Sequence, residues 1–229
     1  MSQHDGHRER LRQRFLQEGL DPFTDVQVLE LLLFYCIPRR DTNPIAHTLL
    51  DHFGSLSQVL EASVEELRRI EGMGDQAAVF LHLVTQVGRY YLKDRVTKTK
   101  VLPTLESCAQ YLLPYFFGRK VEVVYLLCLD AKCKVLCCRK VAEGEVNSTA
   151  LSARRVVEQA LLANASCVVL AHNHPGGLAI PSQEDVDTTR FIAAALRAVE
   201  ISLIDHIVVA EDDYVSMVQS GYSFQNAVL

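Results

Sequence analysis

Four residues that could together perform metal chemistry lie within fourteen positions of one another: His172, His174, Ser182 and Asp185. The apolar run just before them, residues 167–171, predicts a buried strand. If the strand continues through the histidines, positions i and i+2 place both imidazoles on the same side. Two neutral imidazoles and a carboxylate are the ligand set of a catalytic zinc, which keeps its fourth position for water. The spacing therefore predicts a zinc site at a strand end.

The two downstream residues also have a purely structural explanation. Ser182 followed by Asp185 has the form of a helix N-cap with an acidic residue at the third position, which needs no catalysis. Both roles are compatible, because a capped helix start would hold a metal-binding carboxylate in place. We therefore expect a helix over residues 182–198 that brings Asp185 back over the strand end.

The first part of the chain carries helical patterns throughout. Helix starts are indicated by polar capping residues and by a proline in a first turn, and helix ends by glycines and a proline. The expected helices span 8–20, 25 to the proline at 38, 43–54, 55–60, 63–72 and 75–93. A Thr-Lys-Thr-Lys stretch at 97–100 then predicts an exposed linker. We expect a helical domain over residues 1–98 and a second domain over residues 99–229.

The second domain alternates between helical and strand patterns. Expected helices span 106–116, 152–163 and 182–198, and expected strands span 121–129, 135–138, 167–171, 202–209 and 214–217. Helices and strands mixed in this order are typical of an α/β layer domain with a central sheet.

Composition excludes several classes of protein. The 229 residues are 49% hydrophobic and 22% charged, with a net charge of −5, as in an ordinary globular protein. Residues 1–98 carry 12 Lys and Arg against 14 Asp and Glu, so neither domain offers a general basic field for nucleic acid. Seven cysteines without CxxC spacing, and a polar start without a secretory signal, indicate reduced thiols and a cytoplasmic protein. The longest apolar run, about ten residues at 28–37, is too short to cross a membrane.

The histidine motif resembles that of a known family. Residues 172–177 (His-Asn-His-Pro-Gly-Gly) and 181–185 (Pro-Ser-Gln-Glu-Asp) resemble the JAMM motif of JAB/MPN metalloproteases. They are more similar to the RadC family, whose pattern reads HNHPSG…PSxxD. Residues 161–165 and 203–207 match further segments of that family. The resemblance covers residues 101–229 strongly and the helical part less tightly. It implies a JAB/MPN-like (cytidine-deaminase-like) α+β domain, a central mixed sheet flanked by helices.

The resemblance also implies roles for individual residues. His172, His174 and Asp185 would bind Zn2+, and Ser182 would stabilise the oxyanion formed on an attacked carbonyl. JAMM enzymes use an upstream glutamate as general base. Glu122 is our candidate, because it lies eight positions before Asp130 and matches the family's E-x7-D arrangement. Glu143 and Glu145 are the alternatives.

A later histidine, His206, falls in the segment that matches the family. We expect it to have a structural role or to support a ligand rather than to bind the metal itself. Its neighbour Asp205 could orient the ring.

A second motif lies in the helical domain, where residues 67–78, within 55–92, resemble a helix-hairpin-helix. In DNA-binding versions the glycines, here Gly72 and Gly74, let backbone N–H groups approach a phosphate. Acidic residues flank this turn and would repel a phosphate, and Arg68 and Arg69 are the main compensation. The alternative is a helical hairpin used for packing or protein contact.

Together these patterns predict a zinc-dependent hydrolase, a JAMM-type metallopeptidase or isopeptidase acting on a peptide or protein. The alternative is a DNA-associated repair or binding protein, in which the helical domain contacts DNA and the metal domain is nuclease-like or non-catalytic. The sequence leaves the oligomeric state open.

Overall fold

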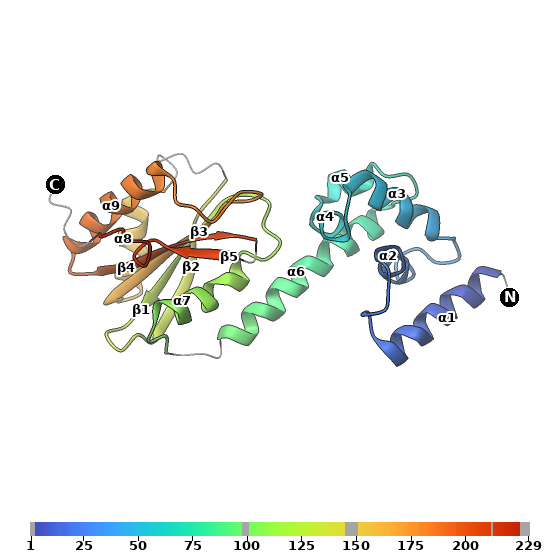
Figure 1. The fold of residues 1–229 in the computed structure, drawn as a ribbon, viewed down its shortest axis with the longest axis horizontal. Helices are drawn as coiled ribbons and strands as arrows, with labels where there is room; N and C mark the ends of the chain where they lie inside the picture. Colours follow the sequence, from blue (N-terminus) through green and yellow to red (C-terminus); the bar gives the residue numbers. More distant parts are fainter. Residues whose placement is uncertain (1–2, 98–100, 145–150, 212, 225–229) are drawn as a thin grey trace. The chain divides into compact units, whose positions relative to one another are not determined.

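The computed structural model describes residues 3–97, 101–144, 151–211 and 213–224 (Figure 1). The chain divides into two compact units, Met1–Gly88 and Arg89–Leu229. Among the described residues, no helix has both the length and the apolar character needed to cross a membrane.

The first unit is helical, as predicted. Its elements are α1 (Gln3–Glu18), α2 (Asp25–Leu33), α3 (Asn43–Phe53), α4 (Leu56–Glu61), α5 (Val64–Arg68) and the start of α6 (Asp75–Thr97). Polar caps set the starts: the side chains of Thr24, Ser55 and Ser63 each accept a backbone N–H of the helix that follows. The helix starts were predictable because capping is a local interaction.

The division between the units lies inside α6, ten residues before the predicted boundary at residue 98. The last part of α6, from Arg89, belongs to the second unit. The Arg89 side chain donates to the Phe117 carbonyl at 3.0 Å, and Val96 packs on the second core. A helical pattern continues through both halves of α6, so the sequence alone does not show this division.

The second unit is built on a five-stranded mixed sheet with strand order β2-β1-β3-β4-β5. The strands are β1 (Val123–Leu129), β2 (Val135–Glu143), β3 (Cys167–Asn173), β4 (Ser202–Ala210) and β5 (Asp213–Ser216). Among the strand pairs of the described residues, only β3–β4 is parallel. Helices α8 (Ala153–Leu162) and α9 (Gln183–Arg197) cover one face, and α7 (Leu105–Leu112) with the 3-10 turn η1 (Leu113–Tyr115) covers the other (Figure 1). The predicted architecture is confirmed.

The central strands are buried on both faces and divide their side chains between two cores. On β3, Val168 and Leu170 pack with α8 and α9, whereas Val169 and Ala171 pack on the α7 side. By the same alternation, His172 belongs to the α9 side. Edge strand β2 is longer than the predicted 135–138; its continuation begins with the exposed pair Arg139 and Lys140 before the buried Val141 and Ala142, which interrupts the apolar alternation in the sequence.

Candidate metal centre

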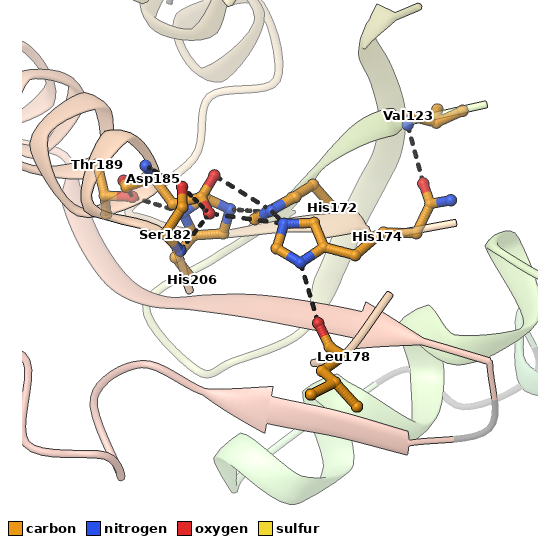
Figure 2. Close-up of polar contacts among 9 residues, drawn as sticks. Val123, His172, His174, Leu178, Ser182, Asp185, Thr189 and His206 are labelled. Atoms are coloured by element: carbon orange, nitrogen blue, oxygen red, sulfur yellow. Dashed lines mark hydrogen bonds and ion pairs between the residues drawn. The ribbon is translucent and has the colours of Figure 1, made fainter. Parts of the chain in front are cut away.

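The candidate site lies where the start of β1, the end of β3 and the start of α9 meet (Figure 2). Glu122 immediately precedes β1, and Asp185 is in the first turn of α9. His172 is the second-last residue of β3, and His174 is the first residue after this strand. One ligand atom from each of these four residues lies within 4.8 Å of the others. The structure thus brings together residues separated by more than fifty positions in the chain.

A hydrogen bond on the side of the ring that faces away from the cluster fixes the tautomer of His174. Its Nδ1 lies 3.0 Å from the carbonyl oxygen of Leu178, which can only accept (Figure 2). Nδ1 therefore carries the proton, and Nε2 presents a lone pair to the site.

A chain of three hydrogen bonds fixes the tautomer of His172. The Thr189 hydroxyl donates to the Asp185 backbone carbonyl at 2.5 Å, so it must accept from His206 Nδ1, also at 2.5 Å. His206 Nε2 is then the acceptor for His172 Nδ1–H at 2.8 Å. Burial lowers the pKa of His206 well below its ordinary value, which keeps the ring neutral as this arrangement requires. His172 Nε2 is therefore also left with a lone pair.

Three acceptors consequently converge on one point. His172 Nε2 lies 2.9 Å from His174 Nε2 and 3.2 Å from Asp185 Oδ1, and His174 Nε2 lies 3.6 Å from Asp185 Oδ2. Two lone pairs and a carboxylate repel one another unless a cation lies between them. Imidazole nitrogens and a carboxylate oxygen are suitable ligands for zinc. The donor set therefore fits a metal ion.

The contacts of Asp185 favour its ionised form. Burial raises the pKa of the Asp185 carboxyl, but the hydroxyl and the backbone N–H of Ser182 both donate to this carboxyl and lower its pKa. The predicted capping box is present: Ser182 Oγ accepts the Asp185 N–H at 3.1 Å, and Asp185 Oδ2 accepts the Ser182 N–H at 2.7 Å. The Ser182 hydroxyl donates to the same Oδ2 at 2.6 Å. Capping thus also positions the carboxylate.

The predicted role of Asp205 is wrong. Its carboxylate does not reach the His206 ring but accepts from three other groups: the backbone N–H of His206 at 2.8 Å, that of Val218 at 3.1 Å, and the Ser216 hydroxyl at 2.6 Å. Thr189 holds the ring instead. Thr189 lies one helical turn after Asp185 on α9, and this spacing was the only sequence signal for it.

Of the two predicted general bases that the structure describes, Glu122 and Glu143, only Glu122 lies in the cluster. With His172 and Asp185 it lines a small cavity of about 20 Å³, enough for one water molecule. Glu143 binds Arg119 and Lys140 on the other side of the strand pair. Glu145 lies outside the described residues.

Asp130, the second residue of the E-x7-D pattern, lies at the far end of β1 from Glu122. Its carboxylate accepts the backbone N–H groups of Lys132 and Lys134 at 2.8 and 2.9 Å, which lowers its pKa. Asp130 therefore stabilises the β1–β2 turn.

The residues of the predicted DNA-binding hairpin have structural contacts. Arg68 Nε pairs with Asp75 Oδ1 at 2.9 Å, and Arg69 caps the end of α5. Gly72 has φ +88°, and a Cβ there would lie 2.9 Å from Ile45 Cδ1. Gly74 has no neighbour within 4 Å of a Cβ position. The conformation of Gly72 is therefore explained by packing.

The fold and the site together define a RadC-like JAB-domain protein. The family model described as RadC-like JAB domain matches residues 102–222, and the model described as UPF0758 N-terminal matches residues 4–79. The UPF0758 protein FN0909 of Fusobacterium nucleatum is 35% identical over 230 residues, covering 96% of this chain and 99% of that protein. The UPF0758 protein SPO0054 of Ruegeria pomeroyi is 34% identical over 216 residues, covering 94% and 96%. The chain belongs to the RadC (UPF0758) family, as the motif predicted.

The JAB domain and the cluster of two histidines, an aspartate and a glutamate support a metal-dependent hydrolase type of module. The cluster could hold a metal ion in a position reached from a cavity, which is the arrangement that hydrolytic metal sites need.

Proposed function

We propose that the protein is a zinc-dependent metallopeptidase or isopeptidase of the JAMM type. The observation that carries the proposal is the convergence of His172 Nε2, His174 Nε2 and the Asp185 carboxylate beside Glu122. Outer hydrogen bonds turn both imidazole lone pairs toward the same point, so the ligands are ready to bind before the metal arrives.

The proposed chemistry is amide hydrolysis by an activated water molecule. A zinc ion held by the three ligands would lower the pKa of a water and polarise the scissile carbonyl. Glu122 takes a proton from the attacking water and returns it to the leaving nitrogen as the C–N bond breaks. The Ser182 hydroxyl, one bond rotation from its contact with Asp185, donates to the oxygen of the tetrahedral intermediate.

The charge around the cavity favours an amide over a phosphodiester substrate. Glu122, Glu184 and Asp185 line the cavity, and none of the described residues that line it is Lys or Arg. A phosphodiester brings negative charge and needs cationic groups to offset it, whereas a peptide bond is neutral. We therefore propose a peptide or protein substrate.

Metal analysis combined with cleavage of a peptide library tests the proposal. Wild-type protein is expected to bind one zinc per chain and to cleave a subset of peptides, and Glu122→Gln to keep the zinc but lose cleavage by at least about 100-fold. Glu143→Gln is the matched control, because it removes a carboxylate from the same strand pair outside the cluster, and it should cleave as wild type does. Zinc-loaded wild type that cleaves nothing beyond what Glu122→Gln cleaves contradicts the proposal.

A further inference from the structure

The residue between the two histidine ligands, Asn173, makes two hydrogen bonds with the chain around Glu122, one buried and one partly buried. Its Oδ1 accepts the Val123 backbone N–H at 2.8 Å, and its Nδ2 donates to the Val121 carbonyl at 3.2 Å. Asn173 itself is only 5% exposed. The Asn173 side chain thus hydrogen-bonds to the backbone on both sides of Glu122.

Asn173 can make these two hydrogen bonds because strands β1 and β3 stop pairing with each other at the site. The β1–β3 ladder ends at the pair Val124–His172, while β3 continues along β4: Asn173 pairs with Val209, and the His174 N–H donates to the Val209 carbonyl at 2.8 Å. Beyond this pair, the hydrogen bonds of the Asn173 side-chain amide replace the backbone hydrogen bonds that would continue the β1–β3 pairing.

The other side of this segment is held by the edge strand pair. The Gly144 backbone N–H donates to the Glu122 carbonyl at 2.9 Å. The backbone of Glu122 is therefore fixed from β2 on one side and by the Asn173 side chain on the other, although Glu122 itself lies just before the first residue of β1.

The amide is the side chain that both contacts require. A backbone N–H needs an acceptor and a backbone carbonyl needs a donor, and the Asn amide offers one of each at the correct spacing. An aspartate at position 173 would keep an acceptor for Val123 but present a second acceptor to the Val121 carbonyl.

We propose that Asn173 is a positioning residue that sets the place of Glu122 relative to the two histidine ligands. His172 and His174 point to the metal side of β3, and Asn173, one residue away from each, points to the opposite side and holds β1. The same three consecutive residues therefore place both imidazoles and the backbone that carries the carboxylate. The inference that this arrangement matters for catalysis rests on the proposed function. The positioning of Glu122 by Asn173 does not depend on that function.

The tautomers of the ligands do not depend on Asn173, because His206 and the Leu178 carbonyl fix them. Substitution of Asn173 should therefore separate metal binding from catalysis. We expect Asn173→Asp and Asn173→Ser to keep zinc affinity within roughly threefold of wild type and to lower turnover about 100-fold, the usual effect of an ångström-scale misplacement. Turnover should fall with little change in KM, because no substrate contact is removed.

Two readouts need no substrate. Amide hydrogen exchange should show Val123 protected in wild type and at least about tenfold less protected in Asn173→Ser, with the middle of β1 unchanged. The carboxyl 13C NMR signal of Glu122, assigned by its loss in Glu122→Gln, should shift on addition of zinc alone to wild type and shift less in both Asn173 variants.

Ser216→Ala is the matched control. Ser216 is also 5% exposed, lies in the same sheet, and likewise makes one donated and one accepted side-chain hydrogen bond, to Asp205 and from the Gln219 N–H. This variant should lose comparable stability while keeping Val123 protection, the Glu122 signal and turnover. If Asn173→Ser does not fold, Asn173→Asp tests the proposal through turnover and the Glu122 signal alone, because it retains the contact with Val123.

The proposal is overturned if the Asn173 variants keep both the protection of Val123 and the zinc response of Glu122. It is also overturned if they lose zinc binding as strongly as His172→Ala, because Asn173 would then support the ligands and not Glu122. If the wild type cleaves no peptide, the proposed function fails, while the exchange and NMR measurements still decide whether Asn173 positions Glu122.

Discussion

Removal of the Thr189 hydroxyl should weaken metal binding although Thr189 is not a ligand. Thr189 is fully buried, accepts from His206 Nδ1–H and donates to the Asp185 carbonyl. Thr189→Val preserves the shape of the side chain but removes both contacts. His206 is then free to move its proton to Nε2, which forces the proton of His172 onto the nitrogen that faces the metal.

Typical energies of such contacts give the expected losses of stability and of zinc affinity. Loss of the partner of a buried ring N–H costs about 1–3 kcal/mol of unfolding free energy. Loss of an outer hydrogen bond to a metal-binding histidine typically lowers metal affinity 10- to 100-fold, about 1.4–2.7 kcal/mol. We therefore expect both a less stable metal-free protein and a 10- to 100-fold weaker zinc complex.

Competition of the protein with a chromophoric chelator for zinc measures the affinity, and urea unfolding of the metal-free protein measures the stability. Thr85→Val is the matched control, because the buried Thr85 hydroxyl also donates to a backbone carbonyl, that of Leu60 at 2.7 Å, in the first unit. It should lose stability but no zinc affinity. Unchanged zinc affinity in Thr189→Val, with a stability loss equal to that of Thr85→Val, would refute the assignment of the tautomers.

Three further results are expected. Gly72→Ala should destabilise the first unit by about 1–3 kcal/mol, because φ is +88° and the new methyl would meet Ile45, and should leave zinc binding unchanged; urea unfolding followed by circular dichroism of the helices checks this. Cys108 and Cys128 should resist alkylation at pH 8 until the protein unfolds, because burial raises the pKa of each thiol to about 12; modification seen by mass spectrometry of the native protein would contradict this. Asp130→Asn should destabilise the protein at pH 7 and less so at pH 3, because a carboxylate with a lowered pKa contributes its full stability above its unfolded pKa and loses it as the pH falls toward and through the folded value; a urea midpoint shift equal at both pH values would contradict this.

The parts of the fold that depend on neighbouring residues were predictable from the sequence. Helix starts followed from caps such as Thr24 and Ser63, and the start of α9 followed from Ser182 and Asp185. The candidate metal-binding cluster was recognisable because His172, near the end of β3, and His174, just after it, lie two positions apart, and because Asp185 lies in the first turn of the helix that follows.

The supporting contacts were not predictable, because their partners are remote in the sequence. Thr189 meets His206 across 17 positions, and Asn173 meets Val123 across 50. Neither spacing leaves a periodic signal, and Asn173 reads in the sequence only as the residue between two ligands. The mistaken role of Asp205 has the same origin: adjacency in the chain suggested a contact with the His206 ring, whereas neighbours in a strand point to opposite faces.

X-ray absorption at the zinc edge of the loaded protein reports the metal ligands themselves. We expect two imidazole nitrogens and two oxygens at about 2.0–2.2 Å, with one imidazole lost in His172→Ala and the spectrum retained in Glu122→Gln. A sulfur ligand at about 2.3 Å, or an imidazole signal that His172→Ala leaves unchanged, would contradict a metal centre built from His172, His174 and Asp185.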